Sequence, residues 1–408
     1  MTYSIRRWRQ RTACIFALAA ATLASCGFFT TPGAAVSASE RLAVSGRSAA
    51  VAVVTGDANS PTSIPIKSVD ALLDKAFNRS GQVAVVDAGS RPALHAVILG
   101  GHFGNSEAKS AAETQQVGAV DVALNRVVPA TPQSDPWASV VEALGWLHSQ
   151  GGGTLVVENS GLGTAGFLDY RNVGLLEADP AQLVAFARAN HELPDGVNVT
   201  VVLLGIGWTA LPQEPLDVPH RANLVAQWKA LLTATGARVT VDETPLTDPG
   251  PHPAPPVSPI VITEASWVIP QGECGAQFDS SELHFQVGTA TLLDPQIATV
   301  ALREVVADLR SDRQVADVTG TTSSEGGDAL NGPLSLRRAW VVVQLMESIG
   351  LPVAQVGRVT GLGSHFPGFV TDTAPDGSLL LGPAAEDRMV RITWPCTSGD
   401  PYRPPPQG

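Results

Sequence analysis

Two adjacent arginines, Arg337 and Arg338, follow a loop of small polar residues that reads GTTSSEGGDALNGP from residue 320 to residue 333. A guanidinium group can hold a carboxylate with two parallel hydrogen bonds. The first turn of a helix also favours anions, because its backbone N–H groups point outward. The apolar periodicity predicts a helix from Ser335 with both arginines in its first turn. The pair is a candidate anion site, and a solvated helix face is the alternative.

Other residue types that perform chemistry do not form a catalytic pattern. NSGLG at 159–163 departs from the G-x-S-x-G nucleophile motif. GLGTAG at Gly161–Gly166 matches G-x-G-x-x-G, but no continuous helical run follows, which favours a glycine-rich connecting loop over a dinucleotide site. Four histidines lack metal-site spacing and are expected on the surface or in satisfied hydrogen bonds: His102, His148, His191 and His220. The sequence predicts no catalytic residue, metal or cofactor, and a protein that is not an enzyme.

The first 26 residues have the organisation of an export signal. Four arginines within the first eleven residues precede an apolar segment, Ala13–Ala24, that is too short to span a bilayer. The segment closes with LASC, Leu23–Cys26, which resembles the lipobox of bacterial lipoproteins. That resemblance implies a lipid, such as palmitate, on Cys26, and an ordinary signal peptide with an incidental cysteine is the alternative. We expect a protein of the cell envelope, anchored to a membrane through Cys26 on the extracytoplasmic face.

Cys274 and Cys396 are the two cysteines that remain beyond this segment. Exported proteins are permitted disulfides, so the simplest expectation is that these two pair. Two unpaired buried thiols are the alternative. In the chain-entropy model a bridge of this span stabilises the fold by roughly 4–5 kcal/mol.

Composition indicates a globular protein, with 44% hydrophobic and 16% charged residues. The formal net charge of −12 argues against nucleic acid and against an anionic membrane surface as partners. Segments rich in proline and small residues divide the chain. The predicted organisation is a signal peptide at 1–26, a flexible tether at 27–48, an α/β domain at 49–244, a proline-rich linker at 245–259, a second domain at 260–398 and a disordered tail at 399–408.

The first domain alternates apolar strands with amphipathic helices, which predicts a parallel sheet covered by helices. The residue pattern of GAVDVALNRVV at 118–128 is compatible with either a strand or a helix. The whole pattern is similar to a von Willebrand factor A-like domain. In that family an Asp-x-Ser-x-Ser loop holds a metal. Here Asp57, Asn59 and Ser60 have the wrong spacing, and Asn159 stands where a second aspartate is expected. We expect a degenerate domain that holds no metal and serves as a protein-interaction module.

The second domain carries four segments in order: LHFQVGTATL, VTGTTSSEGGDALNGPLSLRRAWVVVQLMESIGLP, VGRVTGLGSHFP and EDRMVRITW. Together they resemble the OmpA-like peptidoglycan-associated domain, over roughly residues 283–394. The residue pattern favours a βαβαββ order, with a first, half-buried strand at Glu282–Val287, where polar and apolar residues alternate. The predicted fold class is therefore α/β plus α+β: a parallel helix-covered sheet followed by an OmpA-like βαβαββ domain.

The resemblance also implies a ligand. In that family an aspartate takes the ammonium of the diaminopimelate residue of peptidoglycan, and an arginine fifteen residues later takes its carboxylate. Arg338 stands at the arginine position and Ser323 at the aspartate position. Losing the charged contact costs about 1–2 kcal/mol, or about tenfold in affinity. The implied peptidoglycan-binding residues are Thr322, Ser323, Asp328, Asn331 and Arg338, with Glu325 or Asp328 able to compensate for Ser323, and with Asn331 and Arg388 expected to fix the loop and the last strand.

These observations predict a lipid-anchored cell-envelope protein. Its C-terminal domain contacts diaminopimelate-type peptidoglycan non-covalently, with binding weakened by Ser323, and its α/β domain binds an unidentified protein partner. The alternative is an envelope adaptor, or a secretion-related interaction protein, whose wall-binding site is degenerate.

Overall fold

The computed structural model describes residues 50–61, 67–126, 132–243, 245, 255–262, 269 and 272–395. The predicted signal peptide, the lipid site at Cys26, the tether, Cys396 and the C-terminal tail lie outside the described residues.

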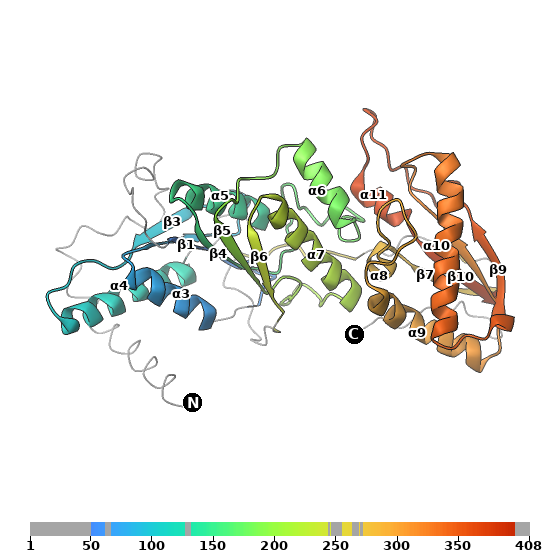
Figure 1. Ribbon diagram of the computed structural model, residues 1–408, viewed down its shortest axis with the longest axis horizontal. Coiled ribbons are helices and arrows are strands. Elements are labelled where there is room, and N and C mark those ends of the chain that lie inside the picture. Colours follow the sequence, from blue (N-terminus) through green and yellow to red (C-terminus); the bar gives the residue numbers. More distant parts are fainter. Residues whose placement is uncertain are drawn as a thin grey trace.

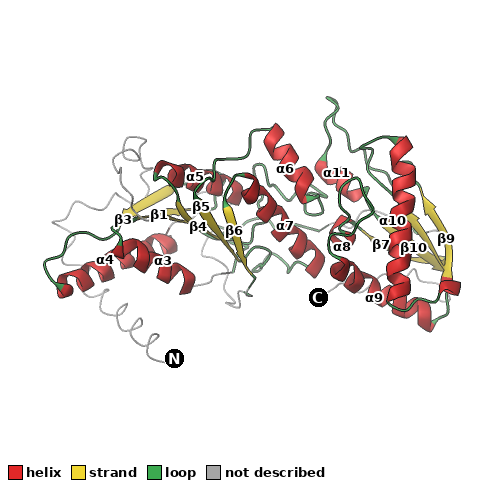
Figure 2. Ribbon diagram, in the orientation of Figure 1, coloured by secondary structure: helices red, strands yellow, loops and turns green. Residues whose placement is uncertain are grey.

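The first domain is built on a six-stranded sheet with the strand order β3-β2-β1-β4-β5-β6 (Figures 1 and 2). The strands are β1 (Ala50–Val54), β2 (Gln82–Val86), β3 (Leu94–Ile98), β4 (Gly153–Glu158), β5 (Val199–Leu204) and β6 (Arg238–Asp242). Neighbouring strands are parallel except for β3, which runs antiparallel to β2. The predicted parallel sheet is confirmed, with an antiparallel edge strand added to it.

Helices cover both faces of this sheet (Figure 2). They are α3 (Lys67–Asn78), α4 (Ser106–Arg126), α5 (Pro136–Ser149), α6 (Pro180–Ala189) and α7 (Val218–Ala234). Residues of α3 and α4 share one core with Val51 and Val53 of β1, whereas residues of α5 and α7 share the other core with Ala52 and Val54. Two-sided burial explains why these strands read as continuous apolar runs. The segment at 118–128, for which the sequence favoured neither strand nor helix, is helical through Arg126 and forms the end of α4.

Aspartates fix the starts of the helices on one face. Asp135, Asp179 and Asp217 are the N-caps of α5, α6 and α7, and each accepts hydrogen bonds from backbone N–H groups of the first turn. A proline follows each aspartate within two residues, where a missing N–H costs nothing. Two of these caps, Asp179 and Asp217, also face the second domain and matter below.

The second domain contains a four-stranded mixed sheet in the order β7-β10-β8-β9. The strands are β7 (Glu273–Phe278), β8 (Ala316–Gly320), β9 (Val356–Gly361) and β10 (Val390–Pro395). The helices are α8 (Ser280–Leu283), α9 (Pro295–Ser311), α10 (Asp328–Ser348) and α11 (Leu381–Glu386), and a 3-10 turn, η1, spans Val353–Gln355. Strand β10 is antiparallel to β7 and β8, and β8 is parallel to β9. The predicted fold class is confirmed.

Two element boundaries in this domain were predicted wrongly. The first strand is Glu273–Phe278, and α8 (Ser280–Leu283) includes the first two residues of the predicted strand, Glu282 and Leu283. Asp279 and Glu282 form a capping box there, a helix-start signal that outweighs the alternation of polar and apolar residues. Helix α10 begins at Asp328 and not at Ser335, so Arg338 lies about 2.8 turns into the helix. The argument that a helix N-terminus assists Arg338 is therefore wrong.

The two domains pack directly against each other. Ala385 of α11 belongs to the core of the first domain, and a Cβ atom on Gly174 would overlap the carbonyl oxygen of Gly382. Ile260, which the sequence assigned to the second domain, also packs in the first domain's core. Its backbone N–H donates to Gln213 Oε1 at 2.6 Å. The boundary between the domains is thus a close backbone contact.

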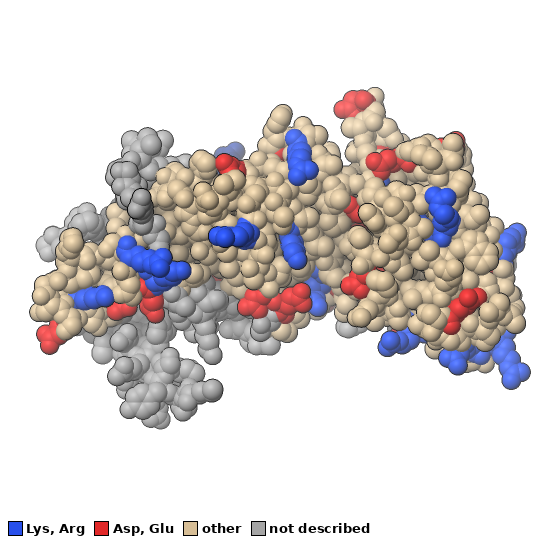
Figure 3. Space-filling view, in the orientation of Figure 1, with Lys and Arg blue, Asp and Glu red and all other residues tan. Residues whose placement is uncertain are grey.

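Lys, Arg, Asp and Glu side chains are scattered over the face shown in Figure 3, and several Lys or Arg side chains lie near one another at its lower right edge. Among the described residues, no helix has the length and apolarity needed to cross a membrane.

Candidate functional site

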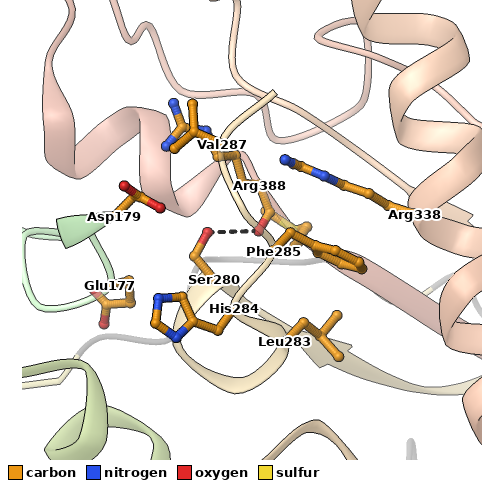
Figure 4. Close-up of a pocket in the computed structure, with 10 residues that line it drawn as sticks. Glu177, Asp179, Ser280, Leu283, His284, Phe285, Val287, Arg338 and Arg388 are labelled. Carbon is orange, nitrogen blue, oxygen red and sulfur yellow. Dashed lines mark hydrogen bonds between the residues drawn. The ribbon is translucent and has the colours of Figure 1, made fainter. Parts of the chain in front are cut away.

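A pocket lies at the boundary between the two domains (Figure 4). The segment before α6 forms one wall, α10 forms the opposite wall, and residues 280–287 lie between them. The lining consists of Glu177, Asp179, Ser280, Leu283, His284, Phe285, Val287, Arg338, Arg388 and Met389. Of the five predicted peptidoglycan-binding residues, all of them described, Arg338 is the one that lines this pocket.

Arg338 projects its guanidinium end into the pocket (Figure 4). Its side chain is 5% exposed, its Nε donates to the Thr289 carbonyl oxygen at 2.9 Å, and its guanidinium carbon lies 5.1 Å from the ring centre of Phe285. Burial, reinforced by the charge of Arg388, lowers the pKa of Arg338 to about 10, so the group stays cationic at neutral pH. Among the described residues no carboxylate forms an ion pair with Arg338. This cation can therefore take a carboxylate from a ligand.

Ser323 does not occupy the role that its sequence position implied. Its hydroxyl accepts a hydrogen bond from Arg388 Nε at 3.1 Å, and its backbone oxygen accepts from Asn331 Nδ2 at 3.0 Å. A ligand ammonium beside this hydroxyl would meet the guanidinium of Arg388 and be repelled. The loop residue therefore cannot serve as the ammonium acceptor in this arrangement.

Glu325 does not compensate for Ser323 either. Its Oε2 accepts from Gln182 Nε2 at 2.5 Å and from Arg388 Nη2 at 3.3 Å. Gln182 belongs to α6 of the first domain, and its Oε1 accepts from Arg388 Nη1 at 2.5 Å. Arg388 thus links the loop of the second domain to a helix of the first, and its hydrogen-bonding groups are engaged by the protein itself.

The opposite wall supplies negative charge from the first domain. Asp179 is 8% exposed, and its Oδ1 caps α6 by accepting from the backbone N–H groups of Ala181 at 2.7 Å and Gln182 at 3.1 Å. The charge of Asp179 acts to raise the pKa of Arg338 and Arg388, although burial lowers both overall. Asp179 therefore faces the two arginines without forming an ion pair with either one.

Arg338 and Asp179 place opposite charges on opposite walls of one small pocket (Figure 4). A ligand with a carboxylate and an ammonium close together would satisfy both walls. Each hydrogen bond to a charged group contributes about 1.5–3 kcal/mol. The arrangement is complementary to a zwitterionic amino-acid group.

The remaining predicted residues build the loop or lie away from the pocket. Asn331 is buried and holds the Ser323 carbonyl, which agrees with its expected role in fixing the loop. Thr322 is buried, its backbone N–H donates to the Gly363 carbonyl at 2.9 Å, and its hydroxyl has no hydrogen-bond partner among the described residues. Asp328 is exposed and pairs with His365 at 3.4 Å. Arg337 is exposed, as expected for a solvated helix face.

Asp387 is a buried acid next to Arg388 in the chain. Its Oδ1 accepts from the backbone N–H of Val370 at 2.9 Å, whereas its Oδ2 is buried without a hydrogen-bond partner among the described residues. Burial, with the charges of Asp372 and Glu386, raises the pKa of this carboxyl to about 7 despite the bond from Val370. The segment that carries Arg388 therefore contains an acid that titrates near neutral pH.

The polar residues at the end of β1 come together as a buried cluster. Asp57 Oδ1 accepts from the Asn59 backbone N–H at 3.0 Å and from the Ser60 hydroxyl at 2.9 Å, and its other oxygen accepts from Ser134. Asn159 donates through Nδ2 to the Thr55 carbonyl at 3.2 Å. The glycine-rich segment Gly161–Gly166 starts no helix, and α6 begins only at Pro180, so the connecting-loop interpretation is confirmed.

Sequence reasoning missed the acids and the amide that the first domain contributes to the pocket boundary: Glu177, Asp179 and Gln182. Asp179 was recognisable as a helix cap from its Asp-Pro pair. No signal in one sequence shows which surface of one domain meets another, so its place opposite Arg338 needed the structure.

No family model matches the chain, and no curated protein matches it. Solved structures resemble its C-terminal domain. The peptidoglycan-associated lipoprotein from Burkholderia pseudomallei is 19% identical, covers 27% of this chain and 86% of its own, and gives a TM-score of 0.23. The periplasmic domain of Helicobacter pylori MotB is 17% identical over 33% of this chain and 82% of its own, with a TM-score of 0.25. The OmpA-like domain of FopA1 from Francisella tularensis is 24% identical over 32% of this chain and 80% of its own, with a TM-score of 0.23.

Proposed function

We propose that this chain is a cell-envelope protein that binds diaminopimelate-type peptidoglycan non-covalently, in the pocket between its two domains. The observation that carries the proposal is the guanidinium of Arg338, which enters the pocket opposite Asp179 and has no ion-pair partner among the described residues. The motif resemblance assigns the same arginine to the carboxylate of diaminopimelate. The sequence motif and the pocket geometry therefore both support Arg338 as the carboxylate-binding residue.

Asp179 takes the ammonium in this proposal, in place of Ser323. Ser323 is engaged by Arg388, whereas the Oδ2 of Asp179 is not needed for the helix cap. An aspartate from the first domain would thus restore the charge that the loop of the second domain lacks. The two charged contacts together would supply the specificity for a zwitterionic group over a simple carboxylate.

The remaining parts of the proposal concern the whole chain. A lipid on Cys26 would anchor it to a membrane, and the first domain would act in binding and not in catalysis. That domain would contribute one wall of the pocket and could also contact a protein partner. The support is the LASC sequence and the packing of α11 against the first domain's core.

Co-sedimentation with purified sacculi tests the proposal. Arg338→Ala should weaken binding at least tenfold, because it removes the pocket's carboxylate receptor. Arg337→Ala is the matched control: the neighbouring arginine is exposed and should change binding less than twofold. Arg338→Lys keeps the charge but loses two-point hydrogen bonding, so it should fall between them. Free diaminopimelate should compete with the sacculi.

Equal binding by the Arg338→Ala and Arg337→Ala variants would place the ligand elsewhere. Far-UV circular dichroism checks the fold of each variant, because Arg338 is buried against Phe285. If Arg338→Ala is unfolded, the comparison of wild type with Arg338→Lys and the competition by free diaminopimelate still decide the result.

The adaptor function is favoured by a different observation. Gln182, Glu325 and Arg388 form a closed set of hydrogen bonds that ties the first domain to the loop at the pocket's edge. A domain contact of this kind holds one fixed surface for a protein partner. If the wild-type protein neither co-sediments with sacculi nor binds free diaminopimelate, the result would favour the adaptor function.

A further inference from the structure

A single histidine is surrounded by carboxylates at the domain boundary. His220 lies in the first turn of α7 and is 6% exposed. Its Nδ1 is 2.7 Å from each carboxylate oxygen of Asp217. Its Nε2 is 3.1 Å from Glu177 Oε1 and 3.9 Å from Asp279 Oδ2. The imidazole therefore has one acid on one nitrogen and two acids on the other.

The acids come from both domains, and their positions are set by helix starts. Asp217 caps α7 and Asp279 caps α8, whereas Glu177 precedes the cap of α6. Asp279 uses its Oδ1 for the backbone N–H groups of Ser281 and Glu282, which leaves Oδ2 toward His220. One donor atom from each of Glu177, His220 and Asp279 lies within 4.8 Å of the other two.

Glu177 has an unsatisfied atom in this cluster. The residue is 8% exposed, and its Oε2 is buried without a hydrogen-bond partner among the described residues, while its Oε1 contacts His220. A buried, unpaired carboxylate oxygen costs free energy that folding does not otherwise recover. A further cation beside Glu177 would remove this cost.

The charges of the cluster also call for a cation. An imidazolium contributes at most one positive charge against Glu177, Asp217 and Asp279. The surroundings are thus strongly negative for a buried site.

We propose that Glu177, His220 and Asp279 bind one zinc-like divalent cation that joins the two domains. The imidazole nitrogen argues against magnesium and calcium, which prefer oxygen donors throughout, and the nitrogen-and-oxygen donor set suits zinc. Asp217 on Nδ1 would hold the ring so that Nε2 faces the metal, which is the usual arrangement around a metal-bound histidine.

The distances fit such a site. Ligand bonds of about 2.0–2.1 Å in a tetrahedral arrangement separate neighbouring donors by roughly 3.3–3.4 Å. The observed separations from Nε2, 3.1 Å to Glu177 and 3.9 Å to Asp279, lie on either side of that value. Small side-chain shifts would therefore complete the coordination, with a water as a fourth ligand.

The consequence of binding would be a stronger domain contact. Two ligands belong to the first domain and one to the second, so the metal binds fully only when the domains are packed together. A ligand that binds only the packed state stabilises it by a free energy that grows with the logarithm of the ligand concentration once this exceeds the dissociation constant. Because Glu177 also lines the pocket, the same metal would fix one wall of that pocket.

The test uses the full chain carrying no histidine tag, stripped with a chelator and titrated with zinc by calorimetry and by elemental analysis after dialysis. Wild type should bind one zinc per chain, with a rise in its unfolding temperature. His220→Ala should lose that zinc and that rise. His148→Ala is the matched control, because His148 is exposed and pairs with Asp195 at 3.4 Å, away from the proposed ligands; it should behave as wild type.

Asp279→Asn provides a second variant, because asparagine keeps the helix cap but weakens the ligand. It should lower zinc affinity at least tenfold even if His220→Ala fails to fold. Magnesium should neither compete nor stabilise. Less than one zinc per wild-type chain, or unchanged binding in both His220→Ala and Asp279→Asn, would overturn the proposal and leave a protonated histidine as the cation of this cluster.

Discussion

The guanidinium of Arg388 donates through Nε to the hydroxyl of Ser323 at 3.1 Å, so the protein itself places a cation where the sequence implied an acceptor for a ligand's ammonium. The same arginine contacts Gln182 of the first domain. The site is therefore built from both domains, and its binding properties should depend on residues of each.

Ser323→Asp should not strengthen the binding of the protein to peptidoglycan. The new carboxylate would lie beside Arg388 and pair with it, which leaves no free charge for a ligand ammonium. We expect affinity for sacculi within twofold of wild type by co-sedimentation. A tenfold gain would instead mean that the loop holds the ammonium and that Asp179 does not.

Asp179→Asn should reduce the affinity for free diaminopimelate about tenfold, because it removes the negative charge that faces Arg338. Asparagine is an equally good helix cap, so the stability of α6 should be unchanged. Calorimetric titration measures the affinity. Asp195→Asn, at an exposed acid of the same domain, is the control and should have no effect.

Asp387 should make the fold less stable as pH rises. Its folded-state pKa, about 7, lies above its ordinary value of 3.8, so the folded state binds more protons between these two pH values. This group's contribution should therefore be favourable near pH 4 and decline as pH approaches 7. Urea unfolding from pH 4.5 to pH 8 measures it. Asp387→Asn should lack that part of the decline, and identical pH profiles for both proteins would contradict the assignment.

A disulfide between Cys274 and Cys396 remains a prediction. Cys274 is buried on β7 opposite Trp394 of β10, two residues before Cys396 in the sequence. Mass spectrometry of a non-reduced digest of exported protein should show the linked peptides. Cys274→Ser should destabilise the fold by up to roughly 4–5 kcal/mol. Two readily alkylated thiols in the exported protein would rule the bridge out.

Cys26→Ala should release the protein from the membrane fraction, because the proposed lipid is its membrane anchor. Fractionation with immunoblotting measures this, and metabolic labelling with a fatty-acid analogue should label wild type but not the variant. A variant that stays in the membrane fraction without label would show that the apolar segment itself is the anchor.

The sequence predicted the architecture well where local patterns decide it. Apolar strands that alternate with amphipathic helices predicted the helix-covered parallel sheet of the first domain. It failed at residues 282–287, where alternation suggested a strand but the capping box of Asp279 and Glu282 starts a helix. It also placed the start of α10 at Ser335, although the helix begins at Asp328 and runs through Gly332 and Pro333.

The candidate site was predictable only in part, for a physical reason. Arg338 was found because its motif lies within one domain. Gln182, which contacts Arg388, and Asp279, which lies beside His220, each belong to the other domain, and one sequence contains no record of which surfaces touch. His220 was set aside because the four histidines lack metal-site spacing. The acids that surround it lie far apart in the sequence, at residues 177, 217 and 279, a spacing that no short metal motif describes.

The backbone contact between Gly174 and Gly382 bears on how such a chain can change during evolution. Any side chain at Gly174 would force the two backbones apart and open the boundary. A second domain moved into another protein would leave behind Asp179 and Gln182, and with Asp179 the acidic wall of the pocket. The two domains are therefore expected to evolve together. A substitution at the boundary in one domain would require a compensating substitution in the other.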